Sequence, residues 1–480
     1  MTTTVIRNAD WAIAWDETAK RPVYRRNIDI AFDGGAITYV GPRYEGRAEA
    51  TIDGARRMVM PGLVNVHSHP GHEPAYRGIR EEHGVRNMYM TGLFERSQAY
   101  AAADRESRAA ATEFAYCELL RSGVTSVVDI GPAWDGWTDL AGRSGLRAFL
   151  APGFASARWK LANDHELRYE WDEQAGRQRF EAALGFVDRL AQHPSGRLSG
   201  VIAPMQIDTC SAELLRDAYA AAAERKLPFT VHIAQGVSEV LEMIRRHGMT
   251  PIQWAAQLGI LGAGTLLGHA IFIDTHSWVR WWTQQDLALM AENGCSVAHC
   301  PTPFARYGHM LESFGGYLKA GVNMAIGTDT SPHNMLEEMR KASSLARIAA
   351  RDIHSVTTAD FLHAATVGGA TALLREDLGR LAPGKKADFV MVDLDCLDMQ
   401  PARDPLRSLV FHAAERAVRD VYIDGRRILA EGKVLTLDPA LAAKRLTEAQ
   451  QRMMAAVPQR DFRGRSAEEI TPLSLPLREL

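Results

Sequence analysis

The chain has 480 residues, and its 55 Lys and Arg nearly balance its 58 Asp and Glu, giving a formal net charge of −3. No strong positive field is present to attract a polyanion or an anionic membrane, so we expect neither nucleic acid nor lipid as a partner. Residues 1–17 lack the basic start and apolar core of a secretory signal, and no apolar run reaches bilayer length, which favours a cytoplasmic protein.

Short β-like runs lie near both ends of the chain. Residues 28–32 and 36–40 are rich in apolar side chains, and the turn-forming Asp33-Gly34-Gly35 separates them. A second β-rich region returns far along the chain, at residues 387–393, 418–423 and 426–429. Because β segments far apart in sequence can pair in space, we expect residues 1–60 and 380–436 to form one small β-sandwich domain.

Apolar β-branched runs alternate with Ala-, Leu- and Glu-rich stretches between these two regions. The alternation is typical of repeated βα units and a parallel sheet. Candidate strands end near eight positions: Val66, Ile130, Gly153, Ile207, His232, His269, His299 and Asp329. Predicted helices include residues 106–122, 212–225 and 286–293. Eight strands suit a closed (β/α)8 barrel, so we expect residues 61–379 to be a barrel catalytic domain and residues 437–480 to be a helix and tail.

One predicted strand runs directly into two histidines, in Pro61-Gly62-Leu63-Val64-Asn65-Val66-His67-Ser68-His69. Side chains at positions i and i+2 of a strand face the same side, so both imidazoles can bind one metal ion. Alone, such a pair also fits two ordinary surface histidines. Three further candidates, however, follow apolar runs whose C-terminal ends would open on the same face: His232, His269 and Asp329. Imidazoles with a carboxylate suit zinc or ferrous iron better than magnesium or calcium.

The chain resembles the amidohydrolase superfamily, particularly its branch of triazine hydrolases and of S-adenosylhomocysteine and guanine deaminases. The resemblance covers nearly the whole chain and includes PGLVNVHSH at 61–69, LGH at 267–269, AHCP at 298–301, GTD at 327–329 and LGRLAPGKKAD at 378–388. It implies a (β/α)8 barrel with a small β-sandwich, and one divalent metal held by His67, His69, His232 and Asp329. Zinc is the first expectation, with iron, manganese and cobalt as alternatives.

The resemblance also assigns roles around the metal. A bound metal lowers the pKa of water from about 15.7 to about 7, so we expect metal-activated hydroxide to attack the substrate. Asp329 would take the proton of the water and pass it to the leaving group, and His269 would orient the water or polarise the substrate. Residues just beyond strand ends are candidate substrate contacts, although loop hydrogen bonds explain them equally well: His72, Arg77, His299, His309 and His333.

Gln235 departs from the pattern of the deaminases in this branch, which carry a glutamate three residues after the strand-five histidine. A glutamine amide cannot transfer a proton at neutral pH, so ring-protonating deamination loses its usual acid. We therefore expect the substrate to be a non-peptide amide, urea or carbamate, as in the similar phenylurea and thiocarbamate hydrolases, with Gln235 among its contacts. The alternative is a deaminase of a purine-, pterin- or triazine-like ring, in which another group supplies the proton.

A non-enzymatic function is a third interpretation. Some barrels of this superfamily have lost their metal and serve as assembly proteins, which predicts lost ligands, whereas all four are retained here. The expected protein is therefore a metal-dependent amidohydrolase that acts on a small molecule at a carbon–nitrogen bond other than a peptide bond. We also expect a homo-oligomer, since relatives often pair and symmetric dimers are the commonest assembly.

Overall fold

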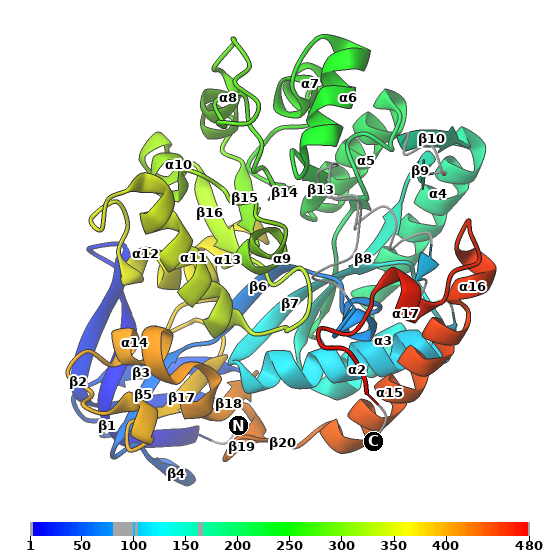
Figure 1. Ribbon diagram of the computed structural model, residues 1–480. Helices are drawn as coiled ribbons and strands as arrows, with labels where there is room; N and C mark the ends of the chain where they lie inside the picture. Colours follow the sequence, from blue (N-terminus) through cyan, green and yellow to red (C-terminus); the bar gives the residue numbers. More distant parts are fainter. Residues whose placement is uncertain (1–2, 80–98, 101–103, 162–166, 479–480) are drawn as a thin grey trace.

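The computed structural model describes residues 3–79, 99–100, 104–161 and 167–478 (Figure 1). It is a mixed α/β structure in which helices surround parallel strands, and a second, mostly antiparallel sheet lies beside them (Figure 1). Within these ranges no helix is both long enough and apolar enough to span a bilayer. The cytoplasmic location expected from the sequence stays a prediction.

The antiparallel region is one nine-stranded sheet in which both ends of the chain take part. β17 pairs with β5 in antiparallel register, Val390 opposite Met60, and this pairing joins the two ends. The strand order is β20-β19-β18-β17-β5-β1-β2-β3, and β4 pairs with β1. The bounds are β1 (Thr3–Asp16), β2 (Arg21–Asp33), β3 (Ala36–Gly41), β4 (Ala50–Asp53), β5 (Arg57–Pro61), β17 (Phe389–Asp393), β18 (Val418–Ile423), β19 (Arg426–Ala430) and β20 (Lys433–Val434).

Two parallel sheets form the centre of the molecule. One has the order β11-β8-β7-β6, with β12 on β8, and the other has the order β13-β14-β15-β16. Single parallel bridges connect them at both edges: Ser68 with Asp329 on one side, and Ile202 with Phe229 and Gln206 with His232 on the other. The bounds are β6 (Leu63–Ser68), β7 (Val124–Gly131), β8 (Arg147–Phe154), β11 (Leu198–Gly200), β12 (Ala203–Pro204), β13 (Phe229–Ile233), β14 (Thr265–His269), β15 (Ser296–His299) and β16 (Asn323–Ile326).

The helices lie around these strands, and the predicted helices are confirmed. Asp104 and Ser211 cap α2 and α5, each accepting a hydrogen bond from a backbone N–H three residues on. The helices are α2 (Arg105–Arg121), α3 (Trp137–Ser144), α4 (Glu173–Leu190), α5 (Ala212–Arg225), α6 (Val237–His247), α7 (Pro251–Leu258), α8 (Asp286–Glu292), α9 (Pro301–Arg306), α10 (Phe314–Ala320), α11 (Met335–Ala350), α12 (Thr358–His363), α13 (Gly369–Ala372), α14 (Pro405–Ser408), α15 (Pro439–Ala455), α16 (Val457–Arg460) and α17 (Ala467–Ile470).

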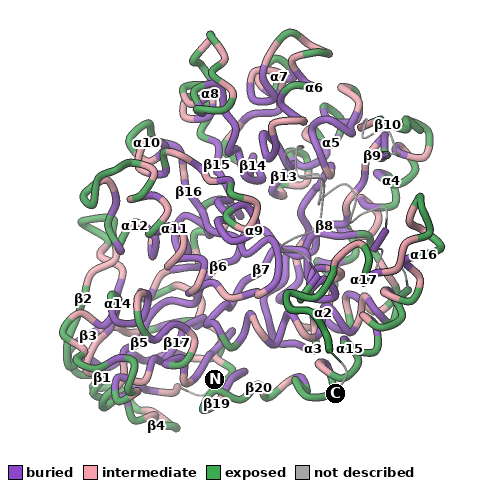
Figure 2. The backbone as a smooth tube through the Cα atoms, viewed as in Figure 1, coloured by how far each residue is buried: buried purple, intermediate pink, exposed green. Residues whose placement is uncertain are grey.

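The core follows the parallel strands, which are buried on both faces (Figure 2). All eight residues of β7 are buried, which explains why these strands read as continuous apolar runs rather than as alternating ones. A buried ion pair connects this core to the antiparallel sheet. The Arg147 guanidinium on β8 donates to both carboxylate oxygens of Asp388, at 2.9 and 3.1 Å, and both side chains are 2% exposed.

Two features of the strands differ from the prediction. The fourth strand was expected to end near Ile207, but β12 ends at Pro204, because the chain turns there and the Ile207 N–H bonds the His232 carbonyl of the next strand. A hairpin of β9 (Ala157–Leu161) and β10 (Leu167–Trp171) follows β8 and was not predicted. β14 and β15 end at His269 and His299 as predicted.

Candidate metal centre

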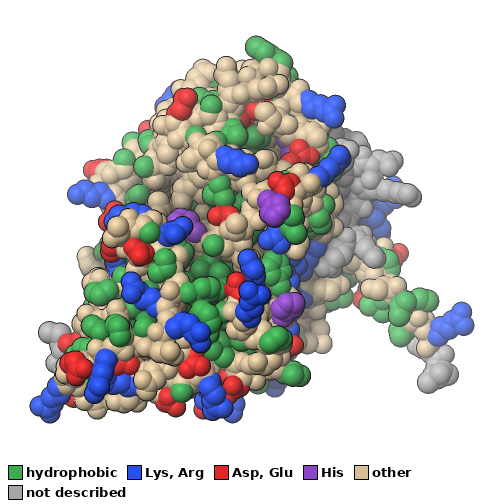
Figure 3. Space-filling model, turned by 90° about the vertical axis from the view of Figure 1, so that its left-hand side faces the viewer, with side chains coloured by type: hydrophobic (Ala, Val, Ile, Leu, Met, Phe, Trp, Pro, Cys, Tyr) green, Lys and Arg blue, Asp and Glu red, His purple; other side chains and the backbone are tan. Residues whose placement is uncertain are grey.

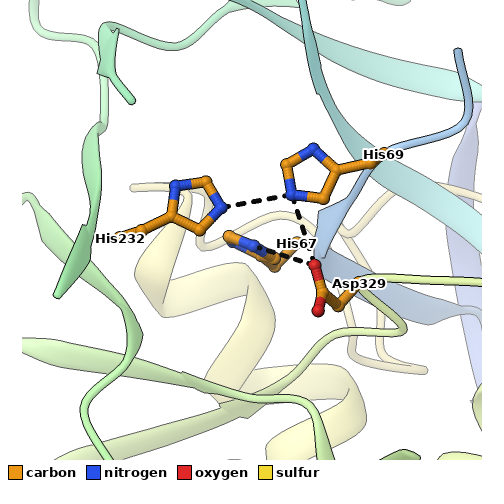
Figure 4. A group of neighbouring side chains, drawn as sticks. All are labelled: His67, His69, His232 and Asp329. Carbon is orange, nitrogen blue, oxygen red and sulfur yellow. Dashed lines mark hydrogen bonds and ion pairs between the residues drawn. The ribbon is translucent and has the colours of Figure 1, made fainter. Parts of the chain in front are cut away.

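Four side chains converge at the C-terminal ends of the parallel strands (Figure 4). His67 lies on β6, His69 directly follows it, His232 lies on β13 and Asp329 follows β16. One potential ligand atom from each lies within 4.8 Å of the others. The His69 Nε2 atom is 3.1 Å from His232 Nε2 and 3.2 Å from an Asp329 carboxylate oxygen, and His67 Nε2 is 3.5 Å from the same carboxylate. All four residues are buried.

The hydrogen bonds of the imidazoles direct their free nitrogens into this cluster. His69 Nδ1 lies 3.0 Å from the Ile130 carbonyl, and His232 Nδ1 bonds the Met205 carbonyl. A carbonyl oxygen only accepts, so each Nδ1 carries the proton and each Nε2 keeps its lone pair toward the cluster. His67, which is fully buried, has no hydrogen-bond partner at either ring nitrogen. A buried set of unfilled donor atoms with this composition fits a divalent metal.

Backbone contacts between β6 and the end of β16 hold this geometry. The Asp329 N–H donates to the His67 carbonyl at 2.8 Å, and the His69 N–H donates to the Asp329 carbonyl at 3.0 Å. Asn65, one of the residues that sequence reasoning missed, donates from its amide to Thr328 Oγ1 at 2.8 Å and accepts from the N–H groups of His67 and Thr328. Its signal in the sequence was a polar residue inside an apolar strand.

The glycines of the LGH and GTD motifs leave room for His67. A Cβ atom at Gly327 would lie 2.7 Å from His67 Cβ, and one at Gly268 would lie 3.1 Å from His67 Cε1. The residues that follow, His269 and Asp329, have left-handed backbone angles, with φ of 84° and 57°. Such angles are uncommon outside glycine and concentrate at functional sites. Close packing on His67 therefore explains both motifs physically.

The charges of the cluster suit ligand chemistry. Burial, together with the neighbouring imidazoles, holds the pKa of His232 well below its usual value, and burial also lowers the pKa of His67. Burial opposes ionisation of Asp329, but the adjacent His67 and His69 imidazoles outweigh it and hold the pKa of that carboxyl well below its usual range. Burial lowers the pKa of His69, but the contact with Asp329 outweighs it and raises that pKa. The result is one carboxylate beside two imidazoles, His67 and His232, that favour the neutral form in which they can bind a metal.

His269 lies beside the cluster but outside the set of converging ligand atoms. Its buried ring is 4.7 Å from the His67 ring, 5.4 Å from the His232 ring and 4.7 Å from the ring of Phe304 on α9, measured between centroids. Burial lowers its pKa well below the usual value. This position is compatible with the predicted role toward water or substrate, which stays a prediction.

The predicted substrate contacts divide by their position. The His72 ring is 5.4 Å from the His69 ring, so it borders the cluster. Arg77 and His333 instead meet Glu118 of α2: the Arg77 guanidinium donates to it at 2.6 Å and the His333 backbone N–H at 3.2 Å. The Glu118 carboxylate thus connects the segment that follows His69 with the segment that follows Asp329 by hydrogen bonds.

The two remaining histidines pack against aromatic rings. His299 is buried 5.5 Å from Phe314, and burial lowers its pKa to about 4. His309 contacts Trp278 and Phe272 at 5.0 and 5.5 Å, and burial lowers its pKa to about 4. Substrate contact by any of these residues stays a prediction.

The neutral side-chain amide of Gln235 pairs with a second neutral amide next to His232. Its side-chain amide donates to the Gln206 side chain, and Gln206 forms a parallel bridge with His232. Glu239 accepts from the N–H groups of Ala234 and Gln235, at 2.6 and 2.9 Å, and is itself buried. Neither Gln206 nor Glu239 was among the predicted site residues, and their positions depend on how the loops after β12 and β13 pack together.

We expect Glu239→Ala to lower the free energy of unfolding by about 2–5 kcal/mol, because it leaves two buried backbone N–H groups without an acceptor. Urea denaturation measures the change. Glu224→Ala on α5 is the matched control: this glutamate is 80% exposed, and its removal should change stability by less than about 0.5 kcal/mol. A Glu239→Ala variant as stable as the control would show that this carboxylate does not hold the loop.

Comparisons with known proteins cover most of the chain. The sequence profile described as "Amidohydrolase family" matches residues 58–428. The 5-methylthioadenosine/S-adenosylhomocysteine deaminase of Haloarcula marismortui is 27% identical over 430 residues, which are 89% of this chain and 94% of that protein. The 5'-deoxyadenosine deaminase of Methanothermobacter thermautotrophicus is 28% identical over 397 residues, which are 82% of this chain and 87% of that protein.

Two solved structures share the fold. An adenosine deaminase from Xanthomonas campestris with bound zinc has a TM-score of 0.79 and 25% identity, covering 95% of this chain and 99% of that chain. A triazine hydrolase from Arthrobacter aurescens has a TM-score of 0.80 and 22% identity, covering 94% of this chain and 100% of that chain.

Proposed function

This chain belongs to the amidohydrolase family and is an enzyme acting on carbon–nitrogen bonds other than peptide bonds, and from that premise we propose that it hydrolyses a small amide, urea or carbamate. Water adds to the carbonyl carbon, the carbon–nitrogen bond breaks, and the nitrogen leaves as an amine after gaining a proton. The main support for this substrate class, rather than an aminated ring, is the pair of neutral amides that Gln235 and Gln206 form beside His232.

We propose that the parallel strands close into a (β/α)8 barrel. The bridges at both edges of the two parallel sheets support this closure, because they leave neither sheet with a free edge near the site. The domain boundaries proposed with it are residues 61–379 for the barrel, residues 1–60 with 380–436 for the small β domain, and residues 437–480 for the C-terminal segment.

The proposed cofactor is one divalent metal, with zinc as the first candidate, held by His67, His69, His232 and Asp329. The unfilled nitrogens of the buried His67 and the convergence of the four side chains support this assignment. The zinc present in the Xanthomonas campestris structure supports the choice of metal. When bound, such an ion lowers the pKa of water and polarises a carbonyl group.

The residues of the chain supply the proton transfers and the positioning. The Asp329 carboxylate, anionic and buried in the cluster, takes a proton from the attacking water and passes it to the leaving nitrogen. The His269 imidazole, beside His67, orients the carbonyl oxygen of the substrate. Phe304 packs on His269 and excludes water from that side of the site.

The identity of residue 235 distinguishes this reaction from deamination of a ring. A glutamine amide can hold a substrate by hydrogen bonds, but it cannot protonate a ring nitrogen. The amine that leaves an amide, urea or carbamate can receive its proton from Asp329, so this hydrolysis needs no second acid. Deamination of a purine-like ring is the second candidate, because the relatives in Haloarcula and Methanothermobacter are named as deaminases.

A product assay separates the two candidates. The zinc-loaded protein is incubated with adenosine-type nucleosides, aminated triazines, amides, aryl and alkyl ureas, and carbamates, and ammonia and amines are quantified separately. We expect amine release from members of the last three classes. Ammonia from an aminated ring, without amine from a urea, amide or carbamate, would establish the deaminase instead.

We expect Gln235→Glu to lower kcat/KM on a urea or carbamate by about tenfold, because it places a negative charge beside Gln206 and His232, where the reaction needs a neutral hydrogen-bond donor. Gln206→Glu is the matched control, with the same change of charge on the partner side chain. A gain of tenfold or more for Gln235→Glu on the best substrate would contradict the proposed chemistry.

A further inference from the structure

The amide pair of Gln206 and Gln235 has two polar atoms that the chain itself does not use. Because Gln235 Nε2 donates to Gln206 Oε1, the atoms left over are Gln235 Oε1 and Gln206 Nε2. Neither atom bonds any residue that the structure describes. Both retain accessible surface, although Gln235 and Gln206 as whole residues are only 7% and 8% exposed. Polar atoms that a small molecule can reach inside a buried pair are suited to recognising it.

The surroundings of this pair differ from the outer surface. Figure 3 shows Lys, Arg, Asp and Glu side chains spread over one outer face of the molecule. The two glutamines are neutral and largely removed from water. Hydrogen bonds are stronger in such a setting, and a polar atom left without a partner costs more there. A ligand that presents the wrong group to the amide pair is therefore rejected more strongly than it would be at the surface.

The loop that carries Gln206 is held from two sides. Asp208 is 1% exposed and accepts hydrogen bonds from Trp159 Nε1 at 2.9 Å and from the Tyr169 hydroxyl at 2.7 Å, which come from β9 and β10. The Arg246 guanidinium of α6 donates to the Asp208 carbonyl at 2.6 Å. These bonds fix the backbone two positions after Gln206, so its side-chain oxygen stays in place as an acceptor for the neighbouring amide.

The backbone around Gln235 is held as well. Ala234 has a left-handed φ of 51°, an angle that is uncommon outside glycine. Its carbonyl accepts hydrogen bonds from the N–H groups of Ile271 and Phe272, both at 2.9 Å, in the segment that follows His269. Gln235 therefore lies between the end of β12 and the segment after β14, on the face where the strands end.

The free oxygen of Gln235 sets a requirement on the ligand. An amide oxygen only accepts, so its partner must be an N–H or O–H group. A ring nitrogen with a lone pair would face this oxygen as a second acceptor and be repelled. An amide, a carbamate or a urea can instead supply an N–H. Because a simple amide or carbamate contains a single nitrogen, the N–H that all three classes can share is on the nitrogen of the bond that breaks.

We propose that Gln235 Oε1 accepts a hydrogen bond from the N–H of the scissile carbon–nitrogen bond, and that Gln206 is a positioning residue that keeps this oxygen turned toward the substrate. This assignment rests on the proposed function and narrows it. The nitrogen keeps its hydrogen while the carbon–nitrogen bond breaks, and it gains one proton from Asp329. The product is then a primary amine or ammonia, and not a secondary amine.

Pairs of compounds that differ only in methylation of that nitrogen test the assignment on the zinc-loaded full chain. The pairs are acetanilide, methyl phenylcarbamate and N,N′-diphenylurea, each with its N-methylated counterpart, and the best substrate of the product assay with its own N-methyl derivative. The amine released gives kcat/KM for each compound. We expect the N–H member of a pair to be preferred by at least about 50-fold.

Variants separate this contact from the conformational effects of methylation, which are the same in every variant. We expect Gln235→Met to reduce the preference to about fivefold or less, because the acceptor is lost. Gln206→Met should reduce it too, because the Gln235 amide can then rotate, whereas Gln206→Glu should retain it, because a carboxylate still accepts from Gln235 Nε2. Gln178→Met, at an exposed glutamine of α4, is the matched control and should keep the full preference. Each preference is a ratio within one protein, so partial unfolding of a variant does not alter it.

The outcomes distinguish this assignment from the proposed function. Equal rates within the pairs, a best substrate without hydrogen on that nitrogen, or a full preference in Gln235→Met would overturn the role of Gln235 while hydrolysis of the carbon–nitrogen bond stands. A full preference in Gln206→Met, or its loss in Gln206→Glu, would overturn the positioning role of Gln206. Absence of amine from every amide, carbamate and urea would overturn the proposed function and this assignment with it.

Discussion

Asp329→Asn is expected to lower kcat by at least about 1,000-fold while the protein remains folded. The amide has nearly the shape of the carboxylate, but it can neither take a proton from water nor carry the negative charge that the neighbouring imidazoles stabilise. The backbone bonds of this residue, to the His67 carbonyl and from the His69 N–H, do not involve its side chain, so the strand ends should stay in place. Steady-state kinetics and thermal unfolding of the same preparation measure both effects.

Asp286→Asn is the matched control for this substitution. Asp286 is also a buried carboxylate, bonded to Thr250 and to the backbone N–H of Asp274, but it lies outside the cluster. Its replacement should reduce stability and leave kcat nearly unchanged. An Asp329→Asn variant that keeps more than a tenth of the activity would show that another group carries the proton.

His67→Ala is expected to reduce the metal content from near one ion per chain to below about 0.1 and to lower kcat/KM at least 1,000-fold, because a divalent ion loses a quarter of its protein ligands. Thermal unfolding gives a readout that does not depend on turnover. A metal that binds only the folded state raises Tm, so a chelator should lower the Tm of the unaltered protein and leave that of His67→Ala unchanged.

His193→Ala is the control for this second substitution. His193 is a half-buried imidazole that bonds Ser195 and lies outside the cluster, so its removal should preserve both metal content and the chelator effect on Tm. If His67→Ala retained a full complement of metal, the four-ligand assignment would be wrong. If neither protein bound any divalent ion, the metal-dependent mechanism would fail as a whole.

The metal site was predictable because its signals are local. An HxH pair at the end of an apolar strand needs only the two-residue period of a strand to place both imidazoles on one side. His232, His269 and Asp329 could be associated with it because parallel strands present their C-terminal ends on one face. The structure brings all four candidate ligands, His67, His69, His232 and Asp329, into a single cluster and places His269 beside it.

Other features followed from tertiary packing alone. The partner of Gln235 is Gln206, 29 positions away on a different strand end, and no periodicity in either segment indicates that contact. Asn65 on β6 bonds Thr328, which follows β16 and lies 263 positions away. The predicted strand end at Ile207 was wrong because the bond of its N–H to the next strand, rather than local propensity, sets the turn.

The sequence by itself thus determined the alternation of strands and helices and the candidate ligand side chains, because those depend on residue type and on repeats of two to four positions, and its motifs at 61–69, 267–269 and 327–329 indicated the family. Only the tertiary structure decided which carbonyls orient the imidazoles and which amide faces Gln235. These depend on distances between segments far apart in the chain. Such distances are set by the packing of the whole core, and no local pattern encodes them.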